Sequence, residues 1–203
     1  MKKTVIWLIV LCLFIGCIIG AFLLYEKLSA DYGNSNLTEV NPPSTDSDNN
    51  VGDENSEETD TGKGEDNLHK NTATDFKVLD SSGKEVNLSD FFGRPIVINF
   101  WATWCVYCKE EMPDFNRAKA ENPDVLFMMV NVGESIEKGT AYIKGEGFML
   151  EAFFDLDYSA AKAYGVTGYP TTFFIDANGN LVSYARGKIN YNTLIKGIKS
   201  ITE

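Results

Sequence analysis

From Phe76 onward the chain alternates between apolar blocks of strand length and amphipathic blocks of helix length. Ile96–Trp101 and Val125–Val132 are near-continuous apolar runs with many β-branched and aromatic residues, which is typical of strands covered on both faces. Asp176–Gly179 supplies turn residues between two apolar runs and predicts a hairpin. The other strands are expected at Phe76–Asp80, Glu85–Leu88, Ala152–Phe154, Thr171–Ile175 and Leu181–Tyr184, and the helices from Cys105 to about Glu121, at Ile136–Lys144, Tyr158–Tyr164 and Tyr191–Ile201.

This order of elements predicts an α/β fold. Strands that alternate with helices and then end in a hairpin imply a central mixed β-sheet with helices on both faces. An N-terminal hairpin over 76–88 precedes that sheet. Ser89 is the expected cap of the short helical turn that follows the hairpin.

The N-terminus carries a second kind of apolar block, which is too long for a strand. Val5 to Tyr25 contains no charged residue over 21 positions and predicts one transmembrane helix within an anchor at 1–30. Lys2 and Lys3 precede the block and acidic residues follow it, so the N-terminus is expected in the cytoplasm and the rest outside. Two alternatives stay open, namely a cleaved signal peptide and a lipoprotein modified at Cys17.

The middle of the chain is polar and acidic. Residues 31–75 include 12 acidic and 2 basic residues and almost no aromatic ones, so they predict a disordered linker between the anchor and a domain at 76–203. This linker accounts for most of the net charge of −11. The domain itself is nearly balanced in charge, which argues against a nucleic-acid binder.

Cys105 and Cys108 stand where a predicted strand gives way to a predicted helix. Unpaired N–H groups and the helix dipole at such a position favour a thiolate. A redox dithiol is therefore expected, with Cys105 as nucleophile, Cys108 as resolving thiol, and Val106 and Tyr107 tuning the potential. A zinc half-site, a structural disulfide and inert thiols are the alternatives. The domain holds only these two cysteines and no histidine, so no metal site is expected.

Two segments resemble a known family. Asn99–Pro113, with the sequence NFWATWCVYCKEEMP, resembles the active-site signature of the thioredoxin superfamily, and in particular its membrane-anchored TlpA/ResA-like branch. Tyr164–Asp176, with the sequence YGVTGYPTTFFID, resembles the second signature of that family. The resemblance implies a thioredoxin-like fold over 76–203. The Val106–Tyr107 spacer departs from the family's usual spacers, so the redox potential does not carry over.

The resemblance also implies roles for residues around the cysteines. The proline that matches Pro170 is cis in this family and faces the disulfide, and the backbone before it binds an extended substrate segment. Trp104 and Tyr169 are expected to contribute to substrate docking.

Glu111 lies three residues after Cys108 and shares a helix face with it. In the resembled branch a glutamate here is partly buried, which predicts a raised pKa and a role as proton shuttle for the resolving thiol. A solvated carboxylate is the alternative. Asn99 occupies the place of a buried acid in cytoplasmic thioredoxins. Its amide cannot take up a proton, so Asn99 is expected to tune the redox chemistry and to leave proton transfer to Glu111. A hydrogen-bonded structural residue is an equal alternative at this position.

The leading hypothesis is a membrane-tethered, extracytoplasmic thiol–disulfide oxidoreductase that reduces disulfides of envelope proteins, for example in cytochrome c maturation. The resemblance implies a membrane electron donor of the CcdA/DsbD type, a monomeric domain, and no cofactor beyond the Cys105–Cys108 disulfide. An envelope disulfide oxidant, an AhpC/TSA-type peroxidase and a copper-binding chaperone are the alternatives. The peroxidase expects a Thr-x-x-Cys context that Thr103 and Cys105 lack, and the chaperone expects a histidine in the domain.

Overall fold

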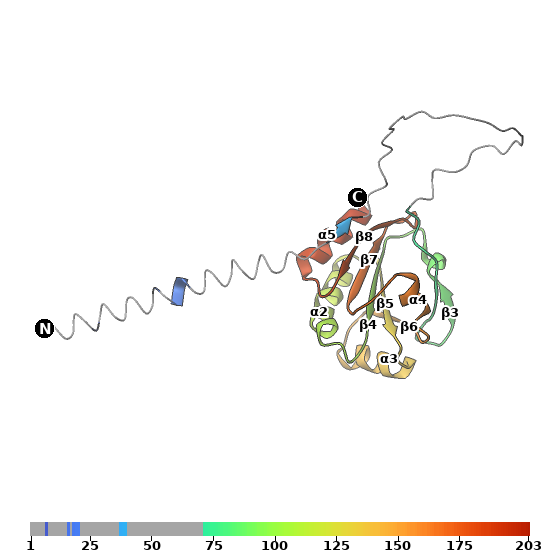
Figure 1. Cartoon of the computed structure of the whole chain (residues 1–203), viewed down its shortest axis with the longest axis horizontal. Helices are drawn as coiled ribbons and strands as arrows, with labels where there is room; N and C mark the ends of the chain where they lie inside the picture. Colours follow the sequence, from blue (N-terminus) through green and yellow to red (C-terminus); the bar gives the residue numbers. More distant parts are fainter. Residues whose placement is uncertain (1–6, 8–15, 17, 21–36, 40–70) are drawn as a thin grey trace, which may run out of the picture. The chain divides into compact units, whose positions relative to one another are not determined.

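The computed structural model describes residues 7, 16, 18–20, 37–39 and 71–203 (Figure 1). Residues 1–36 and 37–203 form two compact units, and the architecture below is that of the second. Within the described part of the chain, no helix has both the length and the apolar character that crossing a membrane requires. Most of the predicted membrane helix at 5–25, and most of the predicted linker at 31–75, lie outside the described residues.

The second unit is built on a mixed sheet with the strand order β1-β8-β7-β4-β5-β6-β2-β3. Strand β4 lies near its centre, parallel to β5 and antiparallel to β7. The strands are β1 Thr38–Glu39, β2 Lys77–Leu79, β3 Glu85–Asn87, β4 Ile96–Trp101, β5 Leu126–Val132, β6 Glu151–Asp155, β7 Thr171–Ile175 and β8 Leu181–Arg186. The helices are η1 Leu88–Phe91, α2 Val106–Glu121, α3 Ile136–Gly145, α4 Ser159–Ala163 and α5 Tyr191–Thr202. The predicted α/β architecture, including the N-terminal hairpin, is confirmed.

The sheet has a hydrophobic core on each face, because successive side chains of a strand point to opposite sides. On one face Val97 and Trp101 of β4 pack in a cluster with residues of α2, α3 and α5. On the other face Ile96 and Ile98 pack with residues of α4, η1 and the β2–β3 hairpin. Figure 1 shows α2 and α5 on one side of the sheet and α4 on the other. By the same alternation, Asn99 lies on the face that α2 covers.

Helix α5 approaches β7 closely at Gly197. A Cβ atom at this position would overlap the ring of Phe174, which is fully buried. We therefore expect Gly197→Ala to lower the free energy of unfolding by about 1–3 kcal/mol, since overpacking forces neighbouring side chains to shift. Urea unfolding measures the change. The same substitution at Gly145, where a Cβ meets nothing within 4 Å, is the control and should be neutral or stabilising. Equal effects at both positions would contradict the close approach.

The structure differs from the sequence prediction at the start of η1. Asn87, not Ser89, is the N-cap residue, and Asp90 closes a capping box by accepting from the Asn87 N–H. The Ser89 hydroxyl instead donates to Asp75 Oδ2 at 2.8 Å. Ser89 thus binds the segment that precedes β2, through Asp75. Its prediction as the helix cap was wrong.

Two stretches within the range predicted as linker make contacts with the domain. Thr38 and Glu39 form β1, an antiparallel edge strand opposite Tyr184 and Ser183 of β8. Residues 71–75 also join the domain, where the Asn71 backbone carbonyl accepts from the Leu181 N–H and the Ala73 N–H donates to the Gly179 carbonyl. The contacts of the domain therefore begin before Phe76.

Candidate active site

Cys105 lies at the junction of β4 and α2, where the sequence places it. It is the N-cap residue of α2, and its Sγ accepts a hydrogen bond from the Cys108 N–H at 3.1 Å. The two cysteines form a disulfide. Cys105 keeps 6% of its surface exposed whereas Cys108 is fully buried, so a partner can reach only Cys105. This difference in access fits the nucleophile and the resolving thiol expected from the sequence.

Exposed apolar side chains surround the disulfide. Val106 and Tyr107, between the cysteines, are 60% and 62% exposed, and Trp104 before them is 64% exposed. The Trp104 ring meets the Tyr169 ring edge-on at a centroid distance of 5.8 Å. The Tyr169–Pro170 bond is cis, as the resemblance implies. The structure thus brings the two signature segments together beside the disulfide, with a surface suited to holding part of another polypeptide.

Glu111 is buried on the helix face that carries Cys108. It is 1% exposed and accepts two hydrogen bonds, from Asn99 Nδ2 at 2.8 Å and from the Ile189 N–H at 3.0 Å. Asn99 Nδ2 also donates to Thr172 Oγ1 at 3.0 Å, which ties the amide to the neighbouring strand β7. Burial raises the pKa of Glu111 to about 8 against these bonds and the charge of Lys188, which lower it. A carboxyl poised near neutral pH can both accept and donate a proton.

Glu134 is a second buried carboxylate, beside the loop that leads to Cys105, and it was not predicted from the sequence. It lies two residues after the end of β5 and accepts hydrogen bonds from the N–H and the hydroxyl of Thr103, each at 2.6 Å. Asn131 Nδ2 donates to it at 2.9 Å, and Lys138 Nζ pairs with it at 2.6 Å. Burial alone would raise the pKa of Glu134, but these bonds outweigh burial and lower it to about 2. Glu134 therefore fixes, as an anion, the loop that delivers Cys105.

The connection between β8 and α5 was also missed. Its Gly187 N–H donates to the Pro170 carbonyl at 2.8 Å, and its Ile189 N–H donates to Glu111 as described. Gly187 has φ of 80°, a left-handed conformation that favours glycine. The signal available in the sequence was this glycine, three residues after the expected strand Leu181–Tyr184. Through these two hydrogen bonds, the β8–α5 connection links Pro170, in the loop before β7, to the buried carboxyl of Glu111.

These features match those of known proteins. The sequence pattern of the AhpC/TSA family matches residues 70–184. The thiol-disulfide oxidoreductase ResA of Bacillus subtilis (strain 168) is 34% identical over 134 residues, which cover 61% of this chain and 74% of the relative. ResA of Geobacillus thermodenitrificans (strain NG80-2) is 33% identical over 132 residues, covering 64% of this chain and 76% of the relative. The chain belongs to the ResA-type oxidoreductases of the AhpC/TSA family.

The fold of this ResA-type oxidoreductase is also found among solved structures. The crystal structure of a putative thiol:disulfide interchange protein DsbE from Chlorobium tepidum superposes with a TM-score of 0.59 at 27% identity. The match covers 64% of this chain and 95% of that protein. The thioredoxin-like fold and the activity class, a thiol–disulfide oxidoreductase, therefore stand on sequence and structure together.

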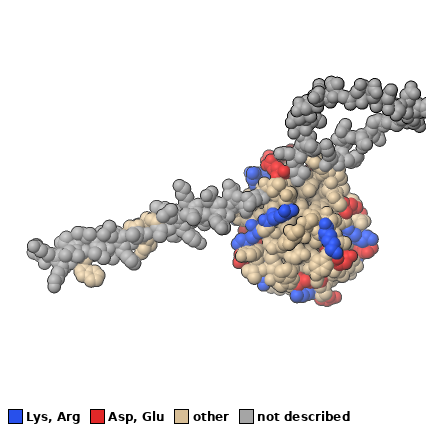
Figure 2. Space-filling model, in the orientation of Figure 1, with Lys and Arg blue, Asp and Glu red and all other residues tan. Residues whose placement is uncertain are grey.

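In the described part of this ResA-type chain, no group of three or more His, Cys, Asp or Glu residues could hold a metal ion. The chain's single histidine, His69, lies outside the described residues. Basic and acidic side chains are interspersed over the face of the domain seen in Figure 2, without a continuous basic surface on that face. The site is thus built from sulfur, two carboxyls and apolar surface.

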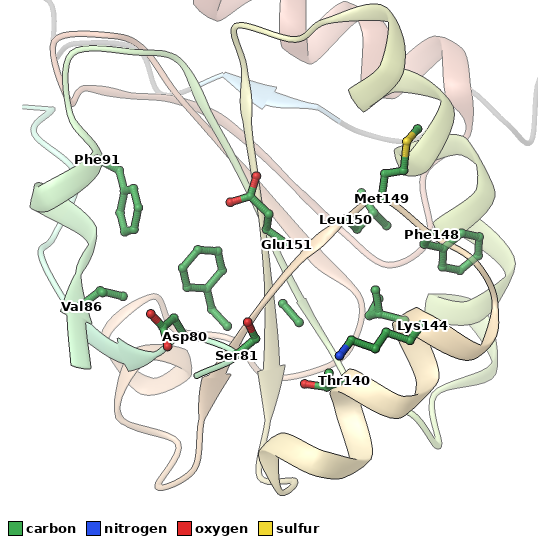
Figure 3. Close-up of a pocket in the computed structure, with 13 residues that line it drawn as sticks. Asp80, Ser81, Val86, Phe91, Thr140, Lys144, Phe148, Met149, Leu150 and Glu151 are labelled. Carbon is green, nitrogen blue, oxygen red and sulfur yellow. The ribbon is translucent and has the colours of Figure 1, made fainter. Parts of the chain in front are cut away.

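A cavity of about 560 Å³ lies away from the disulfide. Figure 3 shows Thr140 and Lys144 of α3 across this cavity from Val86 and Phe91 of the N-terminal hairpin region. None of the site residues predicted from the sequence lines it. The chemistry of the ResA-type site therefore lies on an open surface around Cys105, and not inside this cavity.

The Glu134 network should contribute measurably to stability. Glu134→Ala would leave the N–H and hydroxyl of Thr103 and the amide of Asn131 without their acceptor, so we expect a loss of about 2–4 kcal/mol in the free energy of unfolding. Lys138→Met is the matched control. Its side chain is 58% exposed, and removing an exposed ion-pair partner should cost less than about 1 kcal/mol. Urea unfolding of both variants tests the network, and similar losses in the two would contradict it.

The buried Glu111 should make stability depend on pH. The pKa of its carboxyl is 4.5 in the unfolded chain and about 8 in the folded protein. Between these pH values the native state therefore binds more protons than the unfolded state. The free energy of unfolding should therefore fall as pH rises through this window, by up to about 1.4 kcal/mol per pH unit. Urea unfolding at several pH values, compared with the non-titrating variant Glu111→Gln, measures the effect. A stability difference between the two proteins that stays constant with pH would contradict the raised pKa.

Proposed function

We propose that this oxidoreductase acts outside the cytoplasm, tethered to the cell membrane by residues 5–25, and reduces disulfides of envelope proteins. Proteins handled during cytochrome c maturation are one such class. The observation that carries the proposal is the pairing of an accessible Cys105 with a buried Cys108 and a buried Glu111. The charge-free block of 21 residues and the acidic segment after it support the tether.

The reduction follows from the positions of the two sulfurs. The Cys105 thiolate, at the N-terminus of α2, attacks one sulfur of the partner's disulfide, and the other partner sulfur leaves as a thiolate. Cys108 then gives its proton to the Glu111 carboxylate, and the Cys108 thiolate attacks Cys105 Sγ. The partner sulfur that was bonded to Cys105 leaves as the second thiolate. The partner has then gained two electrons, and the Cys105–Cys108 disulfide has formed.

The apolar surface formed by Trp104, Val106, Tyr107 and Tyr169 would hold the partner's chain during these steps. A membrane electron donor with its own dithiol, of the CcdA/DsbD type, would return the enzyme to its reduced form by the same exchange in reverse. No further cofactor is needed, because the cysteines carry both electrons. The substrate protein and the electron donor would thus use this one surface in turn.

Labelling in intact cells tests the location and the direction of electron flow together. The full chain, with Cys12 and Cys17 replaced by serine, is exposed to a membrane-impermeant maleimide, and Cys105→Ser in that background is the control. We expect Cys105 to react without added reductant, because it lies outside the membrane and is kept reduced. Reaction only after an external reductant would instead indicate an oxidant, and reaction only after lysis would refute the location.

A further inference from the structure

Two adjacent residues of α2 meet two adjacent residues of the β8–α5 connection. Glu111 of α2 accepts the Ile189 N–H at 3.0 Å, and Glu110 beside it pairs through Oε2 with Lys188 Nζ at 2.7 Å. The inner contact is buried, since Glu111 and Ile189 are each 1% exposed. The outer contact lies at the surface, where the Lys188 and Glu110 side chains are 45% and 48% exposed. A surface ion pair and a buried hydrogen bond thus join the same two segments at adjacent residues.

We propose that Lys188, held by Glu110, is a positioning residue for Glu111: it keeps the Ile189 N–H on the carboxyl and supplies a positive charge at the surface end of the site. This inference rests on the role proposed above for Glu111 as acceptor of the Cys108 proton. It adds a residue that the motifs around the cysteines do not contain, because Lys188 is 78 residues from Glu110.

The groups that face Glu111 come from three elements. Asn99 of β4 and the Ile189 N–H of the connection bond to its carboxylate, and the charge of Lys188 also favours the ionised form. Asp114, one turn further along α2, acts in the opposite direction. The pKa of Lys188 is itself raised, chiefly by its hydrogen bond to Glu110, so this lysine stays charged throughout the range in which Glu111 titrates. Lys188 is the cation among these groups.

The charge matters for one step of the reaction. In the mixed disulfide, Cys108 must lose its proton to a Glu111 that is itself ionised before its sulfur can attack Cys105 Sγ. A positive charge beside the carboxyl raises the ionised fraction at neutral pH. Exposed ion pairs contribute little to stability. If the Lys188–Glu110 pair were only structural, its removal would therefore not change the pH dependence of the resolution step.

The resolution step can be measured by itself. The reduced full chain, with Cys12 and Cys17 replaced by serine, is mixed with glutathione disulfide and quenched with acid, and mass spectrometry follows the decay of the protein–glutathione mixed disulfide from about pH 6 to about pH 9. We expect Lys188→Met to move the midpoint of this pH profile by about half a unit to higher pH, which is roughly threefold slower decay at neutral pH. Lys188→Arg should restore the wild-type midpoint. Lys84→Met, which removes a lysine from the β2–β3 turn, controls for net charge.

A charge swap separates the effect of the ion pair, which holds the two segments together, from the effect of the positive charge at position 188. Glu110→Lys combined with Lys188→Glu restores an ion pair but places a carboxylate where the ammonium stood. We expect a larger shift to high pH in this double variant than in Lys188→Met. A wild-type midpoint in either Lys188→Met or the double variant would overturn the inference.

Glu111→Gln distinguishes a failure of this inference from a failure of the proposed Glu111 role. If that variant keeps the wild-type midpoint, Glu111 is not the proton acceptor and both ideas fall. If it abolishes the midpoint while Lys188→Met leaves the profile unmoved, only the role of Lys188 is refuted. In the Glu111→Gln background, we expect Lys188→Met to have no effect on the profile.

Discussion

Cys108→Ser should turn the enzyme into a trap for its partners, and Cys105→Ser should remove its activity altogether. Cys105 retains surface at the start of α2, so it can still attack a disulfide when Cys108 is absent. Without the buried thiol behind it, nothing displaces the bound partner, and the mixed disulfide persists. Cys105→Ser leaves Cys108 fully buried, where no partner disulfide can reach it.

Reduction of glutathione disulfide, with the products resolved by mass spectrometry, measures both effects. Both variants are made in the full chain with Cys12 and Cys17 replaced by serine. We expect a stable glutathione adduct on Cys108→Ser. For Cys105→Ser we expect no adduct, and reduction only at the uncatalysed rate. Lys84→Met should behave like the wild type, because Lys84 lies in the β2–β3 turn. An adduct on Cys108 in the Cys105→Ser variant would reverse the assigned roles.

Glu111→Gln should slow the resolution step by about 10²-fold at neutral pH, the lower end of what a positioned acid or base contributes. The amide keeps the size of the side chain but cannot accept the Cys108 proton. Since the pKa of Glu111 is raised to about 8, the wild-type rate should climb with pH through that value. The rate of the variant should lack this rise.

Rapid acid quenching of the glutathione mixed disulfide gives the resolution rate directly. Glu121→Gln, at the far end of the same helix, is the matched control and should leave the profile unchanged. If Glu111→Gln resolved the mixed disulfide as fast as the wild type, Glu111 would be a structural residue and not a proton acceptor.

The burial of Glu111 could have been decided from the sequence. The buried residues of α2 are Cys108, Glu111, Met112, Phe115 and Ala118, which follow the i, i+3, i+4, i+7 spacing of a single helix face. A carboxyl inside such a stripe faces the core. The strands β4 and β5 were predictable for a related reason, since a near-continuous apolar run of strand length is typical of a strand covered on both faces.

The supporting contacts were not predictable, because they join distant parts of the chain. Glu134 reaches Thr103 across 31 residues, and Ile189 reaches Glu111 across 78. Nothing in the local pattern around Glu134 or Lys188 distinguishes either from a surface charge. The edge strand β1 was missed because backbone pairing with β8, at two residues without an apolar pattern, leaves little trace in a sequence.

The reduction potential of the Cys105–Cys108 pair, measured on the full chain against a glutathione redox buffer, tests the proposed direction of electron flow most directly. A reductant of envelope disulfides should have a potential near or below about −230 mV, in the range of thioredoxins and glutaredoxins. A value above about −150 mV would contradict the account and make the protein a disulfide-forming oxidant. Each 30 mV corresponds to about 1.4 kcal/mol, so the two outcomes are well separated.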